Sequence, residues 1–200
     1  MKNNMNDFEN KYFKEGFNLI AGIDEVGRGA LCGPIVVAIC ILPKNYINNE
    51  INDSKRLTNT KRVQLDKIIR KDCIDFFIEV ISPKKVDQLN PKKASIKGME
   101  NCLNKIKTKP DFVLIDAEKI NSNIKSLSII KGDQKSISIA AASILAKVYR
   151  DNYMMKMAKK YPSYFFESNK GYGTKKHIGA LEKHGPIKDF HRFSYKPIKK

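Results

Sequence analysis

The chain has 200 residues, and its 38 Lys and Arg outnumber its 21 Asp and Glu, giving a formal net charge of +17. This length suits one domain with a sizeable core. The charge favours a polyanionic partner, nucleic acid before an acidic membrane, although a general richness in lysine raises the charge everywhere. The longest apolar run, residues 34–42, is too short to cross a bilayer, and residues 1–14 lack the apolar segment of a signal peptide.

The chain contains four cysteines, Cys32, Cys40, Cys73 and Cys102, and three histidines, His177, His184 and His191. The cysteines form no C-x-x-C pair, and no histidine stands at ligand spacing from them. The histidines recur every seven residues, but a Gly-Pro pair after His184 interrupts any helix that they could share. The pattern predicts reduced core cysteines in a cytoplasmic protein rather than a zinc site or a disulfide framework.

The first half of the chain alternates strand and helix patterns. Residues 1–18 are rich in Asn and Lys and are expected to form a frayed leader. Residues 19–26 and 35–42 are apolar and β-branched, and the linker between them suits a hairpin, so two antiparallel strands are predicted. Thr58 or Thr60 is expected to cap a helix, residues 73–81 to form a strand, and Asn90-Pro91 to begin a helix that ends at about residue 107.

The second half begins with the clearest strand. Residues 112–115 are four apolar residues in a row, which predicts a strand buried on both faces in the centre of a partly parallel sheet, with Asp116 at its carboxyl end. A short strand follows at 126–130, and Asp133 is expected to be the N-cap of the longest helix, which ends at about residue 159. Residues 161–200 are expected to form a basic helical extension packed on one main domain, residues 19–160.

Three separate segments each place a carboxylate where an apolar element would bury it. Asp24-Glu25 follow the apolar run of the first strand, Asp116 ends a later strand, and Asp151 lies on the apolar face of the longest helix. Clustered carboxylates cannot all ionise unless cations lie between them. Oxygen ligands without Cys or His favour Mg²⁺ or Mn²⁺. On a strongly basic protein, this set predicts two-metal phosphodiester hydrolysis, in which one ion activates water and the other stabilises the leaving oxygen.

Each acid also has a structural interpretation. Taken alone, Asp116 is typical of a turn after a strand, and Asp151 is typical of the solvent-exposed end of a helix. Asp133 is interpreted as a helix cap rather than a metal ligand. In addition, successive strand residues face opposite ways. Asp24 and Glu25 therefore require the strand to bend near Gly27, or the longer Glu25 side chain to curl round.

Several short motifs follow one another along the chain. They are Asp24-Glu25-Val26-Gly27-Arg28-Gly29, Asp53-Ser54-Lys55-Arg56-Leu57-Thr58, Leu114-Ile115-Asp116-Ala117, Lys131-Gly132-Asp133, residues 140–151, Tyr161-Pro162, Lys170-Gly171-Tyr172-Gly173-Thr174 and His191-Arg192-Phe193-Ser194. In this order they resemble the motifs of the ribonuclease HII family, from residue 19 to about 197, which is nearly the whole chain. Each motif alone is weak, and the combination is specific.

The resemblance implies a ribonuclease H-like α/β fold, with a mixed five-stranded sheet flanked by helices and a helical C-terminal extension. It implies an endonuclease that cleaves the RNA strand of RNA–DNA hybrids and incises 5′ to a single ribonucleotide in duplex DNA. The products would carry 5′-phosphates, and two Mn²⁺ or Mg²⁺ ions would take part. Asp24, Glu25 and Asp116 match the family's metal ligands, and Asp151 matches its fourth acidic position.

The resemblance also implies residues that bind the nucleic acid. Gly27, Arg28 and Gly29 match the segment whose backbone reads the ribose 2′-hydroxyl, the one group that distinguishes ribose from deoxyribose at a site. Tyr172 matches the tyrosine that stacks on the neighbouring sugar at an RNA-to-DNA junction. Lys55 falls in a motif that contacts phosphates. Asn90 stands where the family often has a nucleic-acid-contacting asparagine, although Pro91-Lys92 departs from the apolar residues that are usual there.

Arg28 also separates subtypes, because the related ribonuclease HIII usually has lysine between these glycines and an extra N-terminal domain. Two other hypotheses stay open: a non-catalytic protein that binds hybrids or DNA, and another two-metal nuclease such as a junction resolvase. The complete acidic set favours an enzyme, and the glycine–arginine–glycine segment with Tyr172 favours ribonuclease HII. We expect a monomer.

Overall fold

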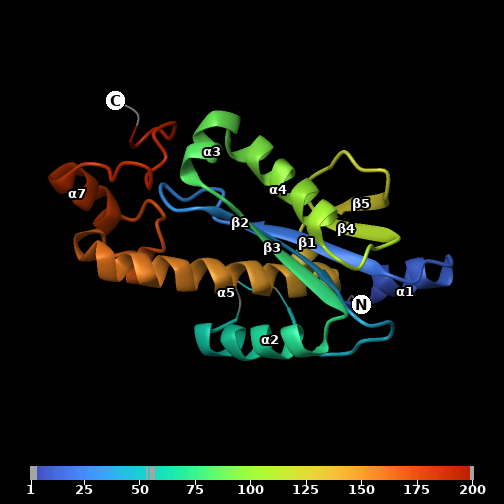
Figure 1. Cartoon of the computed structure of the whole chain (residues 1–200). Helices are drawn as coiled ribbons and strands as arrows, with labels where there is room; N and C mark the ends of the chain where they lie inside the picture. Colours follow the sequence, from blue (N-terminus) through green and yellow to red (C-terminus); the bar gives the residue numbers. More distant parts are fainter. Residues whose placement is uncertain (1–3, 53, 55–56, 199–200) are drawn as a thin grey trace.

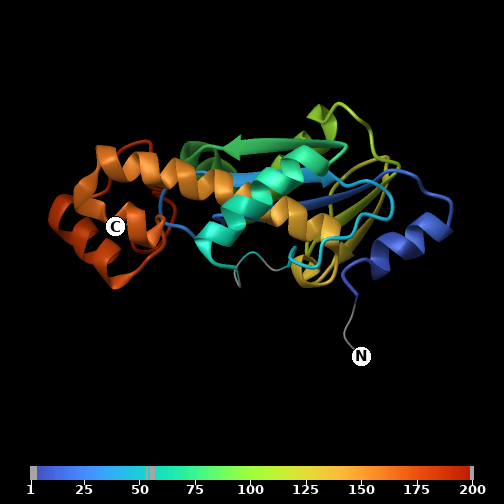
Figure 2. The same cartoon turned by 90° about the horizontal axis from the view of Figure 1, so that it is seen from below.

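The computed structural model describes residues 4–52, 54 and 57–198 (Figures 1 and 2). The strands are β1 (Ile20–Val26), β2 (Ile35–Ile41), β3 (Asp75–Ile81), β4 (Phe112–Asp116) and β5 (Lys125–Ile129). The helices are α1 (Asp7–Lys14), α2 (Asn59–Asp72), α3 (Pro83–Leu89), α4 (Pro91–Lys105), α5 (Ile137–Lys160), α6 (Phe166–Asn169) and α7 (Lys175–His184), with short 3₁₀ turns η1 (Gly132–Gln134) and η2 (Pro162–Tyr164).

The strands form one mixed sheet in the order β3-β2-β1-β4-β5. β1 pairs antiparallel with β2, which pairs antiparallel with β3. On its other side β1 pairs parallel with β4, and β4 pairs parallel with β5. The predicted hairpin and the partly parallel sheet are confirmed. This topology makes β1 the central strand and places the carboxyl ends of β1 and β4 side by side.

Helices cover both faces of the sheet. α4 packs on one face, and α5 with α2 packs on the other, as both views show (Figures 1 and 2). Alternate residues of the central strands supply the two cores: Ile23 and Val37 face α4, while Val36 and Ala38 face α5. Because both faces are covered, these strands are apolar throughout rather than alternating.

α5 lies close against β1 and runs alongside it. A Cβ on Gly22 would lie 2.0 Å from the Ser138 carbonyl carbon, so only glycine allows this approach. Further along, a Cβ on Gly27 would lie 2.2 Å from Nε of the Arg150 side chain. Residues 140–142, all alanine, are fully buried between the two points. The contact fixes which residues of α5 stand beside each position of β1.

Two sequence predictions are wrong, one for the N-terminal segment and one for the residue that begins α5. Residues 7–14 form α1 rather than a frayed leader, because Tyr12 stacks on Phe112 at 3.8 Å between ring centroids. Glu9 of α1 is buried and accepts hydrogen bonds from the Ser136 hydroxyl (2.6 Å) and the Ser138 amide (3.0 Å). Ser136, not Asp133, is the N-cap of α5, since its hydroxyl accepts from the Ile139 amide at 3.2 Å. The predicted caps at Thr58 and Asn90 are confirmed, because each side chain accepts from the backbone amide three residues further on. Thr174 caps α7 in the same way.

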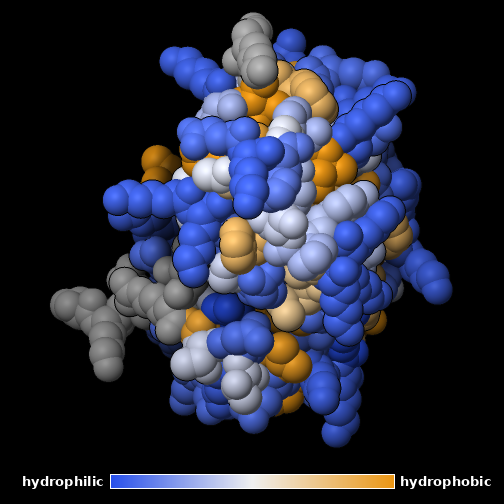
Figure 3. Space-filling model, turned by 90° about the vertical axis from the view of Figure 1, so that its left-hand side faces the viewer, coloured by the Kyte–Doolittle hydropathy of each residue, from blue (hydrophilic) through white to orange (hydrophobic). Residues whose placement is uncertain are grey.

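The C-terminal segment wraps the far end of α5. Met154, Tyr164 and Phe166 lie at the centre of its own small core. Its final stretch is tied back to α3, because Asp87 accepts from the backbone amides of Phe193 (2.9 Å) and Ser194 (3.1 Å). The face at this end is largely hydrophilic, with scattered apolar patches (Figure 3). Among the described residues, no helix has the length and apolarity that crossing a membrane would require.

Candidate active site

Asp24 and Glu25 stand at the end of β1, and their side chains leave opposite faces of the sheet. Asp24 pairs with Ala38 and Glu25 with Val37, and the regular ladder continues to Val26. The turn comes only at Gly27, whose φ of 92° belongs to the left-handed region that glycine adopts freely. The chain therefore bends after the two acids, which approach the same end of the sheet from its two sides.

Asp24 is buried, with 6% of its surface exposed. Burial raises the pKa of its carboxyl group well above the ordinary value, and repulsion from Glu25 and Asp116 raises the pKa further. A hydrogen bond from the side chain of Ser143, on α5, offsets part of this effect. The negative charge of Asp24 is therefore costly in the protein without a cation.

Asp116 ends β4, directly beside β1. The parallel register pairs Ile115 with Ile23, so Asp116 follows alongside Asp24. One of its oxygens, Oδ1, accepts from the Gly132 amide at 2.7 Å. Its charge adds to the effect of burial in raising the pKa of both Asp24 and Glu25, as expected for a carboxylate at the same end of the sheet.

Glu25 is held by an arginine that it shares with a second acid. Its Oε1 accepts from Arg28 at 3.1 Å, and the other guanidinium nitrogen of Arg28 lies 2.6 Å from Glu118 Oε1. Burial raises the pKa of Glu25, and Arg28 opposes this rise. Its Oε2 is buried and lacks a hydrogen-bond partner within the described part of the chain. Glu118 was not predicted from the sequence, where its only signal is its position two residues after Asp116.

These three acids fit a divalent cation. They converge from two neighbouring strands, burial and then the neighbouring charges raise the pKa of Asp24 and Glu25, and Glu25 has a buried oxygen without a partner in the described part of the chain. A cation among them would neutralise the repulsion and give that oxygen a ligand. The donors at the sheet end are carboxylate oxygens, which suits Mg²⁺ or Mn²⁺ rather than zinc.

Asp151 is buried but stands apart from this group. Its oxygens lie 2.8 Å from Lys147 Nζ and 3.9 Å from a guanidinium nitrogen of Arg62. Ser143, which contacts Asp24, precedes Asp151 by eight residues, or about 12 Å along α5. Asp151 is thus at the level of Gly27 rather than Asp24. By contrast, the buried Asp133 directly follows Gly132, whose amide binds Asp116.

The loop from Gly27 to Gly29 combines a fixed backbone with an open outer side. A Cβ on Gly27 would lie 2.2 Å from Arg150 Nε, whereas Gly29 is exposed and has no other atom within 4 Å of its Cβ position. The Arg28 carbonyl accepts from Arg192 at 3.0 Å and from the Tyr195 hydroxyl at 2.5 Å. The backbone is therefore held from inside and accessible from outside at Gly29.

Two fully buried arginines supply most of these internal contacts, although neither was predicted to have a role. Arg150 donates to the carbonyls of Pro34 (3.0 Å), Lys170 (2.9 Å) and Cys32 (3.2 Å). Arg192 donates to the Gly33 carbonyl from two nitrogens, at 3.1 and 2.8 Å. Both guanidinium groups bind carbonyl oxygens from distant parts of the chain, which is why no local pattern could have revealed them.

The remaining predicted contact residues lie in three different situations. Tyr172 is half-buried beside this loop, with the Arg150 guanidinium 5.3 Å from its ring centroid. Asn90 is exposed, adopts a φ of 66°, and caps α4 through its side chain. Lys55 lies outside the described residues.

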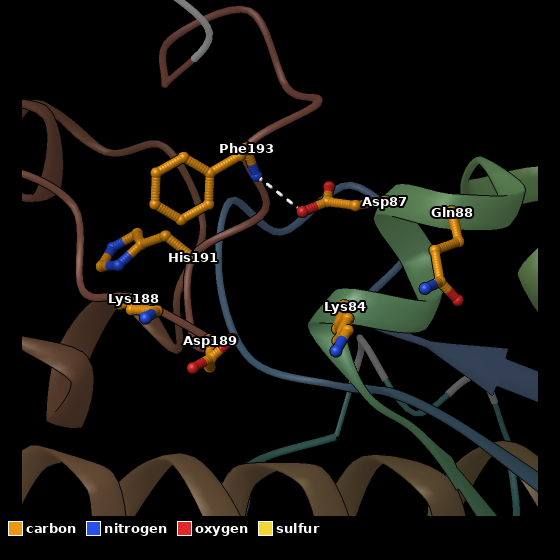
Figure 4. A pocket seen from close by; sticks show the side chains of 7 residues that line it. All are labelled: Lys84, Asp87, Gln88, Lys188, Asp189, His191 and Phe193. Carbon is orange, nitrogen blue, oxygen red and sulfur yellow. Dashed lines mark hydrogen bonds between the residues drawn. The ribbon is translucent and has the colours of Figure 1, made fainter.

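A separate open pocket of about 380 Å³ lies between α3 and the C-terminal segment (Figure 4). It is lined by Lys84, Asp87, Gln88, Lys188, Asp189, His191 and Phe193. None of the acids at the end of β1 and β4 lines it. Figure 4 shows the bond from the Phe193 amide to Asp87 bridging the two sides, so the pocket marks a seam where the C-terminal segment docks.

Comparison with known proteins places this geometry in a family. The family model described as Ribonuclease HII matches residues 21–198. A ribonuclease HII of Caldanaerobacter subterraneus subsp. tengcongensis is 49% identical over 192 residues, which cover 96% of this chain and 79% of that protein. A ribonuclease HII of Mycoplasma capricolum is 52% identical over 184 residues, covering 90% and 88%.

Solved structures agree on the fold. The crystal structure of ribonuclease H2 from Pyrococcus horikoshii superposes with a TM-score of 0.78 at 23% identity, covering 90% of this chain and 95% of that one. The ribonuclease HII of Archaeoglobus fulgidus, solved in complex with PCNA, gives a TM-score of 0.75 at 25% identity, covering 89% and 95%. The ribonuclease H-like sheet, the acids at its end and the motifs along the sequence therefore agree, and the chain belongs to the ribonuclease HII family.

Proposed function

We propose that Asp24, Glu25 and Asp116 bind the divalent cations with which this ribonuclease cleaves the RNA strand of RNA–DNA hybrids and incises 5′ to single ribonucleotides in duplex DNA. The observation that carries the assignment is the convergence of these three carboxylates at the carboxyl ends of β1 and β4. When bound, two such ions would supply an activated water and would stabilise the leaving 3′-oxygen. The cleaved strand then carries a 5′-phosphate. Carboxylate donors support Mg²⁺ or Mn²⁺ in this role.

The residues of this chain position the reacting groups. Asp24 and Asp116 present their carboxylates from adjacent parallel strands, whose hydrogen bonding fixes the spacing. Ser143 and the Gly132 amide orient the two carboxylates by hydrogen bonds. Arg28 holds Glu25, and its attachment to Glu118 keeps the guanidinium at the site when Glu25 turns to a cation.

We further propose that Gly27, Arg28 and Gly29 read the ribose 2′-hydroxyl through their backbone. The exposed Gly29 supports this, because a strand of nucleic acid can approach it without meeting a side chain. Tyr172 lies beside the loop and offers its ring to the neighbouring sugar. We assign phosphate contact to Lys55 and a minor contact to Asn90, whose side-chain oxygen already caps α4 at 3.0 Å.

The fourth acidic position has two candidates. Asp151 is the residue that the sequence motif indicates, and its burial on α5 supports it. Asp133 is supported more directly by contact, because its neighbour Gly132 binds Asp116 and its predicted capping role belongs to Ser136. Asp133→Asn and Asp151→Asn therefore form a matched pair. The variant with the larger loss of kcat identifies the fourth acid.

The test of the function offers duplex DNA with one embedded ribonucleotide, together with Mg²⁺ or Mn²⁺. We expect a single cut 5′ to the ribose by the wild-type protein and no cleavage by Asp24→Asn, which lacks one of the carboxylates proposed to bind the ions. Asp189→Asn is the control, because Asp189 is exposed and its φ of 60° suits asparagine. A cut that persists in Asp24→Asn, or the absence of any cut by the wild type, would contradict the assignment.

We propose that the protein acts as a monomer in the cytoplasm. All four cysteines are free thiols, and three of them are buried, which suits a reducing compartment. Light scattering at micromolar concentration, with and without hybrid, tests the oligomeric state.

A further inference from the structure

The segment that carries Tyr172 is held in an unusual backbone conformation. Lys170 and Gly171 both have positive φ angles, 49° and 85°. A non-glycine residue in this region is strained and persists only where surrounding contacts hold it. The contacts that hold this turn therefore decide where the Tyr172 ring lies.

Three consecutive carbonyls of this turn accept from three different elements. The Lys170 carbonyl accepts from Arg150 of α5 at 2.9 Å, and the Gly171 carbonyl accepts from the Leu31 amide at 2.8 Å. The Tyr172 carbonyl accepts from the Thr174 amide at 2.8 Å and lies 3.0 Å from Nδ1 of His177, on α7. The turn is thus clamped between the helix beside the acids, the loop that includes Gly27 to Gly29, and the C-terminal helix.

The position of each proton in the histidine pair follows from its partners. A carbonyl can only accept, so His177 Nδ1 must carry its proton toward the Tyr172 carbonyl. The Ile187 amide donates to His191 Nδ1 at 2.8 Å, so His191 must carry its proton on Nε2. The two Nε2 atoms are 3.1 Å apart, which makes His191 the donor and His177 the acceptor. Both rings are therefore neutral, each in one defined tautomer.

This arrangement argues against a metal among the same residues. Cys32, His177 and His191 are buried, and their potential ligand atoms lie within 4.8 Å of one another. A metal on His191 Nε2 would displace the proton from that nitrogen to Nδ1, where it would face the donating Ile187 amide. Cys32 would also have to lose its proton, although burial raises the pKa of its thiol to about 12. The cluster is satisfied by hydrogen bonds.

We propose that His177, oriented by His191, is a positioning residue that places Tyr172 against the substrate and thereby sets the preference for single embedded ribonucleotides over long hybrids. The proposal rests on the proposed function, in which Tyr172 contacts the sugar at an RNA-to-DNA junction. The pair acts through a backbone carbonyl and does not itself touch nucleic acid, since both rings are buried. Arg150, with its guanidinium 5.3 Å from the Tyr172 ring centroid, steadies the other side of the turn.

Two conservative variants separate positioning from simple packing. In His177→Asn the amide nitrogen replaces Nδ1 and still donates to the Tyr172 carbonyl, whereas in His177→Gln it replaces Nε2 and the bond to Tyr172 is lost. We expect the ratio of single-ribonucleotide to long-hybrid kcat/KM to fall about fivefold to tenfold in His177→Gln, as for one lost hydrogen bond. In His177→Asn the ratio should stay within about twofold of wild type on the same basis. Equal ratios in both variants would overturn the proposal.

A spectroscopic measurement on the wild-type protein is independent of catalysis and of the folding of any variant. Nitrogen-15 NMR of the histidine side chains should show His177 protonated at Nδ1 and His191 at Nε2, with the exposed His184 as reference. The opposite tautomers, or signals that shift on addition of Zn²⁺ alone, would overturn the proposal. If the protein cleaves neither substrate while the tautomers are as expected, the proposed function fails and the clamp does not.

Discussion

At the scale of single residues, the acids at the end of the sheet store an electrostatic cost. Asp24 is buried beside two other carboxylates, and burial together with their charge raises its pKa. A group with a raised pKa in the folded state destabilises that state when it is ionised at neutral pH. The site is therefore less stable without a cation than with one.

We predict that Asp24→Asn stabilises the cation-free protein while abolishing cleavage. Removing the charge relieves the repulsion, and a gain of about 1 kcal/mol in the free energy of unfolding raises Tm by about 2–4 °C in a protein of this size. Thermal melting in a chelator measures the gain. Added Mn²⁺ should raise Tm in the wild type and much less in the variant. A lower Tm of the variant in the chelator would contradict this account.

The histidine pair gives a stability change of opposite sign. Burial, with electrostatic repulsion between the two rings when both are protonated next in importance, lowers the pKa of His191 to about 4, below the ordinary 6.5. Between pH 6.5 and 4 the unfolded chain is protonated at this histidine and the folded chain is not. The neutral His191 therefore contributes fully to the free energy of unfolding above pH 6.5, and this contribution is lost as the pH falls toward 4. Buried carboxylates with raised pKa values act in the other direction.

A comparison of variants isolates the histidine. We predict that the free energy of unfolding falls less steeply from pH 7 to pH 5 in His191→Gln than in the wild type, because the variant has no imidazole to protonate at this position. Urea unfolding at both pH values measures the two slopes. His184→Gln, at an exposed position, should follow the wild type, and identical slopes in all three proteins would contradict the pKa assignment.

At the scale of elements, α5 connects the cluster of acids to the loop at Gly27. It contacts Asp24 through Ser143 and the loop through Arg150, and Gly22 sets its distance from β1. A change at the Gly22 contact therefore moves both parts of the site together.

We predict that Gly22→Ala destabilises the fold and lowers kcat. The new Cβ would lie 2.0 Å from a backbone carbon of α5, which cannot rotate away, so the helix must shift. Overpacking of this kind costs about 1–3 kcal/mol or more. Gly179→Ala is the matched control, because its Cβ would meet no atom within 4 Å, and in α7 it should stabilise by about 0.5–1 kcal/mol. Unfolding and cleavage assays compare the two.

The elements differ in how much of them the sequence could reveal. The strands, the caps at Thr58 and Asn90 and the Asp24-Glu25 pair depend on neighbouring residues, and these were predicted. α1 was missed because its amphipathic stripe lies within a stretch rich in Asn and Lys. The cap of α5 was misplaced because Asp133 and Ser136 are equally suitable by residue type, and only the folded structure shows that Ser136 binds the Ile139 amide and the distant Glu9.

The contacts of the buried arginines lay beyond any local pattern. Arg192 bonds to Gly33, 159 residues away, and Arg150 bonds to Cys32, 118 residues away. A sequence shows that an arginine is present but not that a distant loop supplies carbonyls for it. The same limit applies to Glu118, whose role depends on the folded position of Arg28.

At the scale of the whole molecule, only part of the positive charge is available to bind phosphates. Arg150 and Arg192 are fully buried on carbonyls and cannot meet phosphates, so the basic side chains on the surface, most of which are lysines, must supply the electrostatic attraction. α7 and the residues after it lie at one end of the molecule, and α1 lies at the other (Figure 1).

We predict that Lys175→Gln reduces the salt dependence of hybrid binding and that Lys14→Gln does not. Each phosphate contact contributes close to 1 to the slope of log K against log salt, because binding releases condensed counterions. Lys175 begins α7 and Lys14 ends α1, and both are exposed. Fluorescence anisotropy in the presence of Ca²⁺, with the salt concentration varied from 50 to about 200 mM, measures the slopes. Equal slopes for the two variants would contradict a role for the C-terminal end.

The distribution of the thiols has a practical consequence. Burial raises the pKa of Cys32 and Cys102 to about 12, and Cys40 is also buried with a raised pKa, whereas Cys73 is half-exposed and its pKa is lowered, chiefly by a hydrogen bond from Cys40. Cys73 precedes β3, whose first residue pairs with Ile41, at the end of the sheet opposite the acids. A maleimide dye should therefore attach at one position, far from the cleavage centre, and the native chain can carry a fluorophore for single-molecule work without an engineered cysteine.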